Sequence, residues 1–199
     1  LLCSNIYILT IHFIYMKKVF MIHGLEGTPN GGWRSWLMNE LQKIDIYACS
    51  LSMPNEVNPI CDEWVEEINR VVNRNKEDEI YLIGHSLGVP TILHFLEKTD
   101  AKISGVILVS GPSKKIDIEK ISHFVDKPLD FGTIQSNCKN FSVIHGEDDP
   151  VVPLGDAGFL SEKLNCDLVI VHEGKHLNGS AGFTQLPECL MELQTMFAK

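Results

Sequence analysis

Short apolar runs of strand length alternate along this chain with amphipathic segments of helix length, and this alternation restricts the possible fold strongly. The apolar runs lie at 17–23, 45–50, 79–84, 103–111, 141–146 and 167–174. Apolar residues at helical spacing occupy 31–43, 58–74, 87–98, 153–164 and 186–199, whereas 112–140 is less regular. Strands that alternate with helices form βαβ units, because parallel strands need a crossover connection. The sequence therefore predicts a three-layer α/β fold, with about six mostly parallel strands and helices on both faces of the sheet.

The length and composition of the chain fit one globular domain. A chain of 199 residues buries a sizeable core without help from disulfides or metals. The formal net charge of -9 repels phosphate backbones and anionic lipid, so neither nucleic acid nor a membrane is an expected partner. The six cysteines include no C-x-x-C pair, and we interpret them as reduced, mostly buried thiols of a cytoplasmic protein.

The N-terminal segment differs from the rest of the chain. Residues 1–15 are apolar and uncharged, and "MKKVFMIHG" then reads like a fresh start at Met16. The segment is shorter than a bilayer span and lacks the basic start of a signal peptide. We expect it to be an arm upstream of the true start, with the domain at 16–199. The alternative is a genuine hydrophobic arm that packs on the domain or on a membrane.

A serine flanked by glycines lies where the third apolar run meets the following helical segment, in "YLIGHSLGVP". This position between a strand and a helix is the one that a nucleophile elbow requires. Side chains two positions before and after the serine would collide in such a turn, which gives Gly84 and Gly88 a steric purpose. Ser86 would then lie at the N-terminus of a helix whose dipole favours developing negative charge. The backbone N–H of Leu87 is expected to point at the same place.

A serine needs a base to act as a nucleophile near neutral pH, and that base needs an acid to orient it. In a fold of this kind the acid and the base follow the serine in the order Asp, His. "VIHGEDDPVVP" follows the fifth apolar run and offers Asp148 and Asp149, while "VIVHEGKHLN" offers His172 and His176. All four candidates lie near the carboxyl ends of predicted strands, where open α/β sheets place their sites.

Four motifs between Met16 and the end of the chain resemble those of the α/β-hydrolase superfamily: "HGLEGTPNGGWRSWL", "GHSLG", "GEDDPVVP" and "GKH". More narrowly, the chain is similar to the small serine hydrolases typified by animal retinoblastoma-binding protein nine and its bacterial relatives. The resemblance covers roughly nine-tenths of the chain and has no place for residues 1–15.

The resemblance implies one domain with a nearly all-parallel sheet and only a small cap. Carried over position by position, it makes Ser86 the nucleophile, His176 its base and Asp149 the residue that orients the imidazole. It also implies that the first loop supplies a second oxyanion donor, the N–H of Leu25. Pro150 favours an extended Asp149, which agrees with an orienting role for that residue.

These features predict a cofactor-independent serine hydrolase that cleaves small acyl esters through an acyl-enzyme. The Gly-rich first loop fits neither G-x-G-x-x-G nor the P-loop, and no metal site is expected. Peptidase, thioesterase or acyltransferase activity is an alternative within enzymes, and a non-catalytic protein-interaction module is the alternative outside them. The segment 112–140 is too short for a large lipase lid. We expect a monomer or small homo-oligomer.

The remaining histidines are interpreted as structural. His23 and His145 end strands, His85 packs beside the elbow, and His94 lies within a helix. Trp33 is expected in the core more often than in the wall of an acyl pocket.

Overall fold

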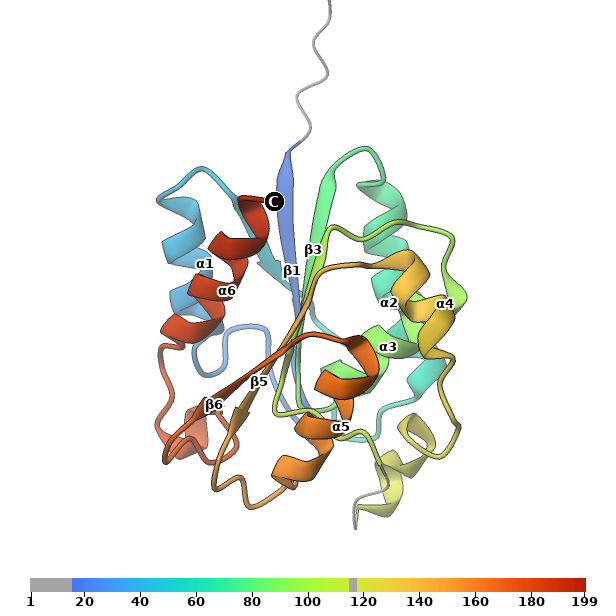
Figure 1. Cartoon of the computed structure of the whole chain (residues 1–199), viewed down its shortest axis with the longest axis vertical. Coiled ribbons are helices and arrows are strands. Elements are labelled where there is room, and N and C mark those ends of the chain that lie inside the picture. The colour runs from blue at the N-terminus through green and yellow to red at the C-terminus, as the bar shows by residue number, and fades with distance from the viewer. Residues whose placement is uncertain (1–15, 115–117) are drawn as a thin grey trace, which may run out of the picture.

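A single parallel sheet organises the part of the chain that the structure, a computed structural model, describes: residues 16–114 and 118–199. Within these residues six strands lie in the order β2-β1-β3-β4-β5-β6, and every neighbouring pair is parallel (Figure 1). The strands are β1 (Lys17–Ile22), β2 (Tyr47–Ser50), β3 (Glu79–His85), β4 (Gly105–Val109), β5 (Phe141–Gly146) and β6 (Asp167–Val171). The predicted α/β sheet is confirmed, and the expected arm at 1–15 lies outside the described residues.

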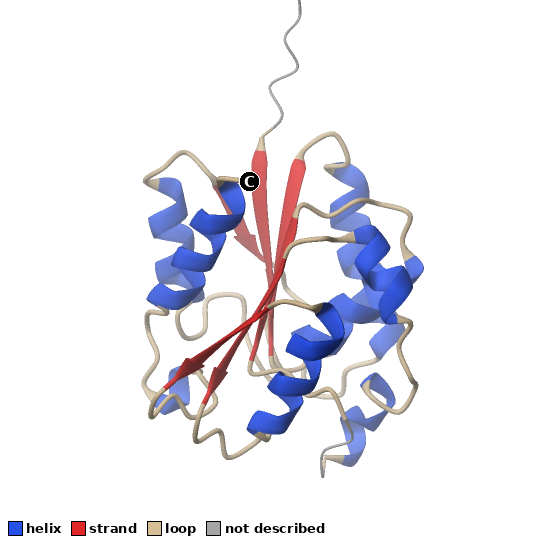
Figure 2. Ribbon diagram, viewed as in Figure 1, coloured by secondary structure: helices blue, strands red, loops and turns tan. Residues whose placement is uncertain are grey.

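Helices cover both faces of the sheet and complete the three layers (Figures 1 and 2). One face carries α1 (Arg34–Gln42) and α6 (Pro187–Phe197). The other face carries α2 (Cys61–Arg74), α3 (Gly88–Lys98), α4 (Phe131–Asn137) and α5 (Leu154–Leu164). Two separate hydrophobic clusters result, one on each side of the sheet.

Strand β1, which lies between β2 and β3, shows why the apolar runs are continuous. Val19 and Met21 pack into the cluster beneath α1 and α6, whereas Phe20 and Ile22 pack into the cluster on the opposite face. Successive side chains of a strand point to opposite faces. A strand that is covered on both faces must therefore be apolar at every position.

The described residues of the segment 112–140 form the small cap that the resemblance implied, and they are more regular than expected. It contains a 3₁₀ turn, η1 (Glu119–Phe124), and the short helix α4, which was not predicted. Asp130 caps α4 by accepting hydrogen bonds from the backbone N–H groups of its first turn. Ile121 and Ile134 are buried against the sheet, while Phe124 and Phe131 also line a cavity of about 650 Å³. Ser86 does not line this cavity.

Two predicted strands are shorter in the structure because residues with left-handed backbone end them. The apolar pattern at 167–174 continues beyond β6, but Glu173 has a φ of 51° and the chain turns there. The pattern at 103–111 also extends past β4, where Ser110 has a φ of 47°. Side-chain hydropathy does not report backbone conformation, so the sequence pattern overestimated both strands.

Two further features concern the length and hydropathy of the helices and the state of the cysteines. In the described parts of the chain, no helix is long and apolar enough to cross a membrane. The cysteines that the structure describes are all free: Cys61, Cys138 and Cys189 are buried, and Cys49 and Cys166 are half-buried.

Candidate active site

The carboxyl end of β3 delivers Ser86 in a strained turn. Ser86 has a φ of 53°, in the left-handed region that side chains other than glycine rarely adopt. A Cβ at Gly84 would lie 2.7 Å from the backbone carbonyl carbon of Gly88, and a Cβ at Gly88 would lie 2.4 Å from the carbonyl oxygen of Ile22. Both glycines are therefore required by close backbone approach, and the turn places Ser86 directly before α3.

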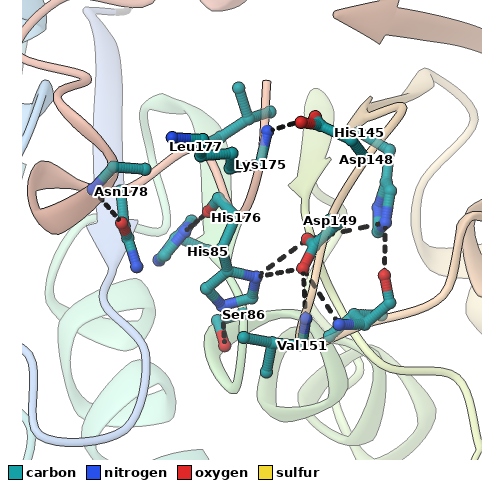
Figure 3. Close-up of polar contacts among 12 residues, drawn as sticks. His85, Ser86, His145, Asp148, Asp149, Val151, Lys175, His176, Leu177 and Asn178 are labelled. Carbon is teal, nitrogen blue, oxygen red and sulfur yellow. Dashed lines mark hydrogen bonds and ion pairs between the residues drawn. The ribbon is translucent and has the colours of Figure 1, made fainter. Parts of the chain in front are cut away.

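The loop after β6 brings His176 to Ser86 (Figure 3). The Nε2 atom of His176 lies 3.0 Å from the Oγ of Ser86. Its Nδ1 atom lies 2.8 Å and 3.1 Å from the two carboxylate oxygens of Asp149. The His176 side chain is 10% exposed and the Asp149 side chain is fully enclosed. Three residues that are far apart in the sequence thus form one hydrogen-bonded chain.

The Asp149 carboxylate is held in place by its own turn. Its Oδ1 accepts hydrogen bonds from the backbone N–H groups of Val151 at 2.8 Å and Val152 at 3.0 Å. Burial is the largest influence on its pKa and raises it. The hydrogen bonds from the imidazole and the two backbone N–H groups together outweigh burial, so the pKa of Asp149 lies below its usual value. The carboxylate is therefore ionised at neutral pH.

The two competing candidates lie elsewhere. The Oδ1 of Asp148 accepts a hydrogen bond from the backbone N–H of Lys175 at 2.8 Å, which ties the turn after β5 to the loop that carries His176. His172 pairs with Glu147 at 2.7 Å, and its side chain is 83% exposed. This hydrogen bond and the nearby carboxylate raise the pKa of His172. The structure therefore brings Asp149 and His176 to Ser86 and leaves Asp148 and His172 apart from it.

The two backbone N–H groups considered as oxyanion donors are free to donate to a ligand. Leu87 directly follows Ser86, and Leu25 lies in the loop after β1. Among the residues that the structure describes, neither N–H donates a hydrogen bond. Leu25 also lines a cavity of about 330 Å³ that contains Ser86 and His176.

The structural interpretation of the other histidines agrees with their contacts. The imidazoles of His23, His85, His94 and His145 each lie within hydrogen-bond distance of a backbone carbonyl and are buried. Burial lowers the pKa of His85 to about 3, so its imidazole is neutral at pH 7. Its Nε2–H donates to the carbonyl oxygen of His176 at 2.9 Å. Trp33 is also buried, and its indole N–H donates to the carbonyl of Leu177 at 2.8 Å.

The cavity around Ser86 includes side chains to which no sequence motif assigns a role. Arg34, Asn178 and Ser180 line it together with the Gly-rich loop after β1. Arg34 opens a helix, where a charged residue ordinarily faces solvent, so its sequence position gave little sign of this placement. In the described residues no group of three His, Cys, Asp or Glu side chains is arranged to hold a metal ion.

Comparisons with known proteins show which chains this protein is similar to in sequence and fold. YdeN of Bacillus subtilis (strain 168) is 31% identical over 186 residues, which cover 92% of this chain and 97% of YdeN. The crystal structure of the ydeN gene product superimposes with a TM-score of 0.87 at 32% identity, over 92% of this chain and 100% of that one. The serine hydrolase RBBP9 of Rattus norvegicus is 22% identical over 140 residues, or 69% of this chain and 73% of RBBP9.

A more distant structure shares the fold. Est1E from Butyrivibrio proteoclasticus superimposes with a TM-score of 0.72 at 16% identity, over 93% of this chain and 90% of that one. Residues 19–195 match the family described as serine hydrolase. With its parallel sheet and this match over most of its length, the chain belongs to the serine hydrolase family and has the α/β-hydrolase fold.

Proposed function

We propose that this protein hydrolyses small acyl esters through an acyl-enzyme formed on Ser86. The observation that carries the proposal is the hydrogen-bonded chain from Asp149 through His176 to Ser86, at the strained turn before α3. A nucleophile within reach of a base that is itself oriented by a carboxylate is the arrangement that acyl transfer requires.

The hydrogen bonds of the imidazole support Nε2 of His176 as the base. The ionised Asp149 carboxylate accepts the Nδ1–H of His176, so the lone pair of Nε2 faces Ser86. The Ser86 hydroxyl donates to Nε2. When Oγ attacks the acyl carbon of the ester, its proton moves to Nε2, and the positive imidazolium is stabilised by Asp149.

The negative charge that develops on the acyl oxygen is stabilised by backbone N–H groups. Leu87 and Leu25 supply these donors, since each N–H lacks an acceptor in the described part of the chain. In another serine hydrolase, removing one oxyanion donor, there a side-chain amide, raises the barrier by about 2.7–4 kcal/mol. The N-terminus of α3 contributes the positive end of its helix dipole, which also stabilises this negative charge.

The cycle closes with water. The C–O bond to the alcohol breaks as Nε2 returns its proton to the leaving oxygen, and the acyl group stays on Ser86. A water molecule then attacks the acyl carbon and gives its proton to Nε2. The bond from the acyl carbon to Oγ breaks, the acid leaves, and Oγ recovers the proton from His176.

The size of the cavity favours small substrates. A volume of about 330 Å³ lies at the lower end of the range for small-molecule pockets. The cap between β4 and β5 consists of one 3₁₀ turn and one short helix in the described residues, so it offers little surface to cover a long acyl chain.

Hydrolysis of p-nitrophenyl esters with graded acyl length tests the proposal. We expect turnover of short acyl esters, and a loss of at least about 10⁴-fold in kcat in Ser86→Ala and in His176→Ala. His172→Ala is the matched control, because its side chain is exposed on the surface, and its activity should stay near that of the wild type. Full activity in Ser86→Ala, or a larger loss in His172→Ala than in His176→Ala, would refute the proposed roles.

A further inference from the structure

The cavity that contains Ser86 also encloses a positive charge. Arg34, the first residue of α1, lines this cavity and is 6% exposed. Its Nη2 donates to the carbonyl oxygen of Thr28 at 2.8 Å, while its Nε is buried without a hydrogen-bond partner in the described residues. Burial lowers the pKa of Arg34 to about 10, which leaves the guanidinium protonated at neutral pH.

No carboxylate of the described residues pairs with this guanidinium. The one acidic side chain that lines the same cavity, Glu26, forms an ion pair with Lys120 at 2.7 Å. Burying a charge without a partner is strongly unfavourable, and such groups are normally paired or hydrogen-bonded. The partners of Arg34 in the described residues are the carbonyl of Thr28 and the ring of Trp33, whose centroid lies 5.9 Å from Cζ, and neither of them neutralises its charge.

A second donor without a protein acceptor in the described residues belongs to Asn178, a half-buried residue that lines the cavity together with Arg34. The Oδ1 of Asn178 accepts hydrogen bonds from the backbone N–H of Ala181 and from the hydroxyl of Ser180, both at 2.8 Å. Because a backbone N–H only donates, this contact fixes the orientation of the amide. Its NH₂ group has no acceptor in the described residues, and Asn178 lines the cavity. Arginine and amide donors together match the two oxygens of a carboxylate.

We propose that the preferred substrates are esters that carry a carboxylate, which Arg34 binds through its guanidinium with help from Asn178. The inference rests on the proposed hydrolysis at Ser86, because both residues line the cavity that contains the nucleophile. The carboxylate belongs either to the acyl part, as in a hemiester of a dicarboxylic acid, or to the alcohol part. Arginine is suited to this task, since its planar fork binds a carboxylate with two parallel hydrogen bonds.

Pairs of esters in which a neutral group replaces the carboxylate test the inference on the wild-type protein. p-Nitrophenyl hemiglutarate and p-nitrophenyl valerate place a carboxylate or a methyl group at the end of a five-carbon acyl chain. 4-Butyryloxybenzoate and its methyl ester place the charge in the alcohol part. We expect kcat/KM for the anionic member of one pair to exceed that of its neutral partner by about tenfold or more. Glutarate should inhibit competitively, and potassium chloride at equal ionic strength should not.

Variants assign the preference to the guanidinium. Arg34→Met should lower kcat/KM for the preferred anionic ester about 30-fold more than for its neutral partner, and Arg34→Lys should retain part of the preference. Arg70→Met, which removes an exposed guanidinium from α2, should leave the ratio unchanged. A merely structural Arg34 would lower both activities equally and keep the ratio.

The outcomes separate the two proposals. Turnover of neutral esters by the wild type, with no preference for either anionic ester, overturns this inference and leaves the proposed function intact. Failure to hydrolyse any of the four esters, together with failure of Ser86 to react with a fluorophosphonate, overturns both. If the Arg34 variants do not fold, the wild-type preference and inhibition by glutarate decide the question alone.

Discussion

Two adjacent carboxylates, Asp148 and Asp149, have separate tasks because the turn after β5 points them in different directions. Asp149 contacts the imidazole of His176, whereas Asp148 accepts the backbone N–H of Lys175. One carboxylate thus meets the candidate base, and the other fixes the loop on which that base is carried. His145 lies beside Asp149, with its Nε2 3.6 Å from the carboxylate and 3.0 Å from the carbonyl oxygen of Val152.

Substituting each carboxylate separately distinguishes these tasks. Asp149→Asn should lower kcat by about 10⁴-fold, because the amide no longer holds the imidazole in the tautomer that accepts the serine proton. Asp148→Asn keeps an oxygen that can accept the N–H of Lys175, so it should lose less than about tenfold. Both values come from ester hydrolysis, with circular dichroism to confirm folding. The reverse ranking would move the orienting role to Asp148.

At the scale of single residues, candidate site residues could be named from the sequence where a motif assigns them a role. Those to which no motif assigns a role could not be named in this way. Ser86 and the candidate acids and bases follow predicted strands in a recognisable order, and the resemblance to small serine hydrolases then favours Asp149 over Asp148 and His176 over His172. Arg34 belongs to the helix pattern at 31–43, and its burial depends on the packing of a loop whose path the sequence does not reveal. Asn178 belongs to no motif, and its place in the cavity depends on the path of the loop after β6.

The junction between β3 and α3 depends on how closely the start of α3 approaches β1. Gly88 opens α3 against the carbonyl of Ile22, where a Cβ would lie at 2.4 Å. Gly158 in α5 is also helical but has open space around it, with no heavy atom within 4 Å of a Cβ. The two helical glycines therefore differ in what an added methyl group would meet.

Alanine substitutions at these two glycines should change stability in opposite directions. Gly158→Ala should raise the free energy of unfolding by about 1 kcal/mol, since alanine favours the helix. Gly88→Ala should lower it by roughly 1–3 kcal/mol through overpacking, and should also lower activity by displacing Ser86. Urea unfolding of both variants beside the wild type provides the measurement. Equal stabilisation by both would show that α3 does not press on β1 in this way.

Most elements could be predicted because hydrophobic periodicity reports burial directly. The strands β1 and β5 fall within their predicted runs, and the helices α2, α3, α5 and α6 lie within the predicted helical segments. The helix α4 was missed because it spans only seven residues and buries one short stretch, too little for a periodic signal. One local feature of the sequence indicates the start of α4, namely its capping Asp130 followed three residues later by Thr133.

At the scale of the whole molecule, the buried His85 contacts both the loop that carries His176 and Trp33, and it makes the stability depend on pH. It lies beneath the His176 loop and packs edge-on against Trp33. Burial lowers its folded-state pKa to about 3, with a further lowering by the nearby His176. In the unfolded chain the same imidazole takes up a proton below about pH 6.5. Stability is therefore lost as the pH falls from about 6.5 toward 3.

Replacing His85 by glutamine should flatten this dependence. Between pH 6 and 4 we expect the wild type to lose about 1.4 kcal/mol of unfolding free energy per pH unit more than His85→Gln. His172→Gln is the control, because its exposed imidazole has a raised pKa and cannot produce a loss in this direction. Urea unfolding at several pH values measures the slopes. Equal slopes in wild type and His85→Gln would mean that His85 is protonated in the folded state.

Labelling with a fluorophosphonate tests most directly the claim that Ser86 is an activated nucleophile. The reagent phosphonylates a serine hydroxyl whose proton is removed by a base, as His176 is placed to do at 3.0 Å. Peptide mass spectrometry of the wild-type protein should find one phosphonate per chain, on Ser86. The adduct should be absent from Ser86→Ala and form far more slowly in His176→Ala. An adduct on another residue, or labelling that persists in Ser86→Ala, would contradict the account.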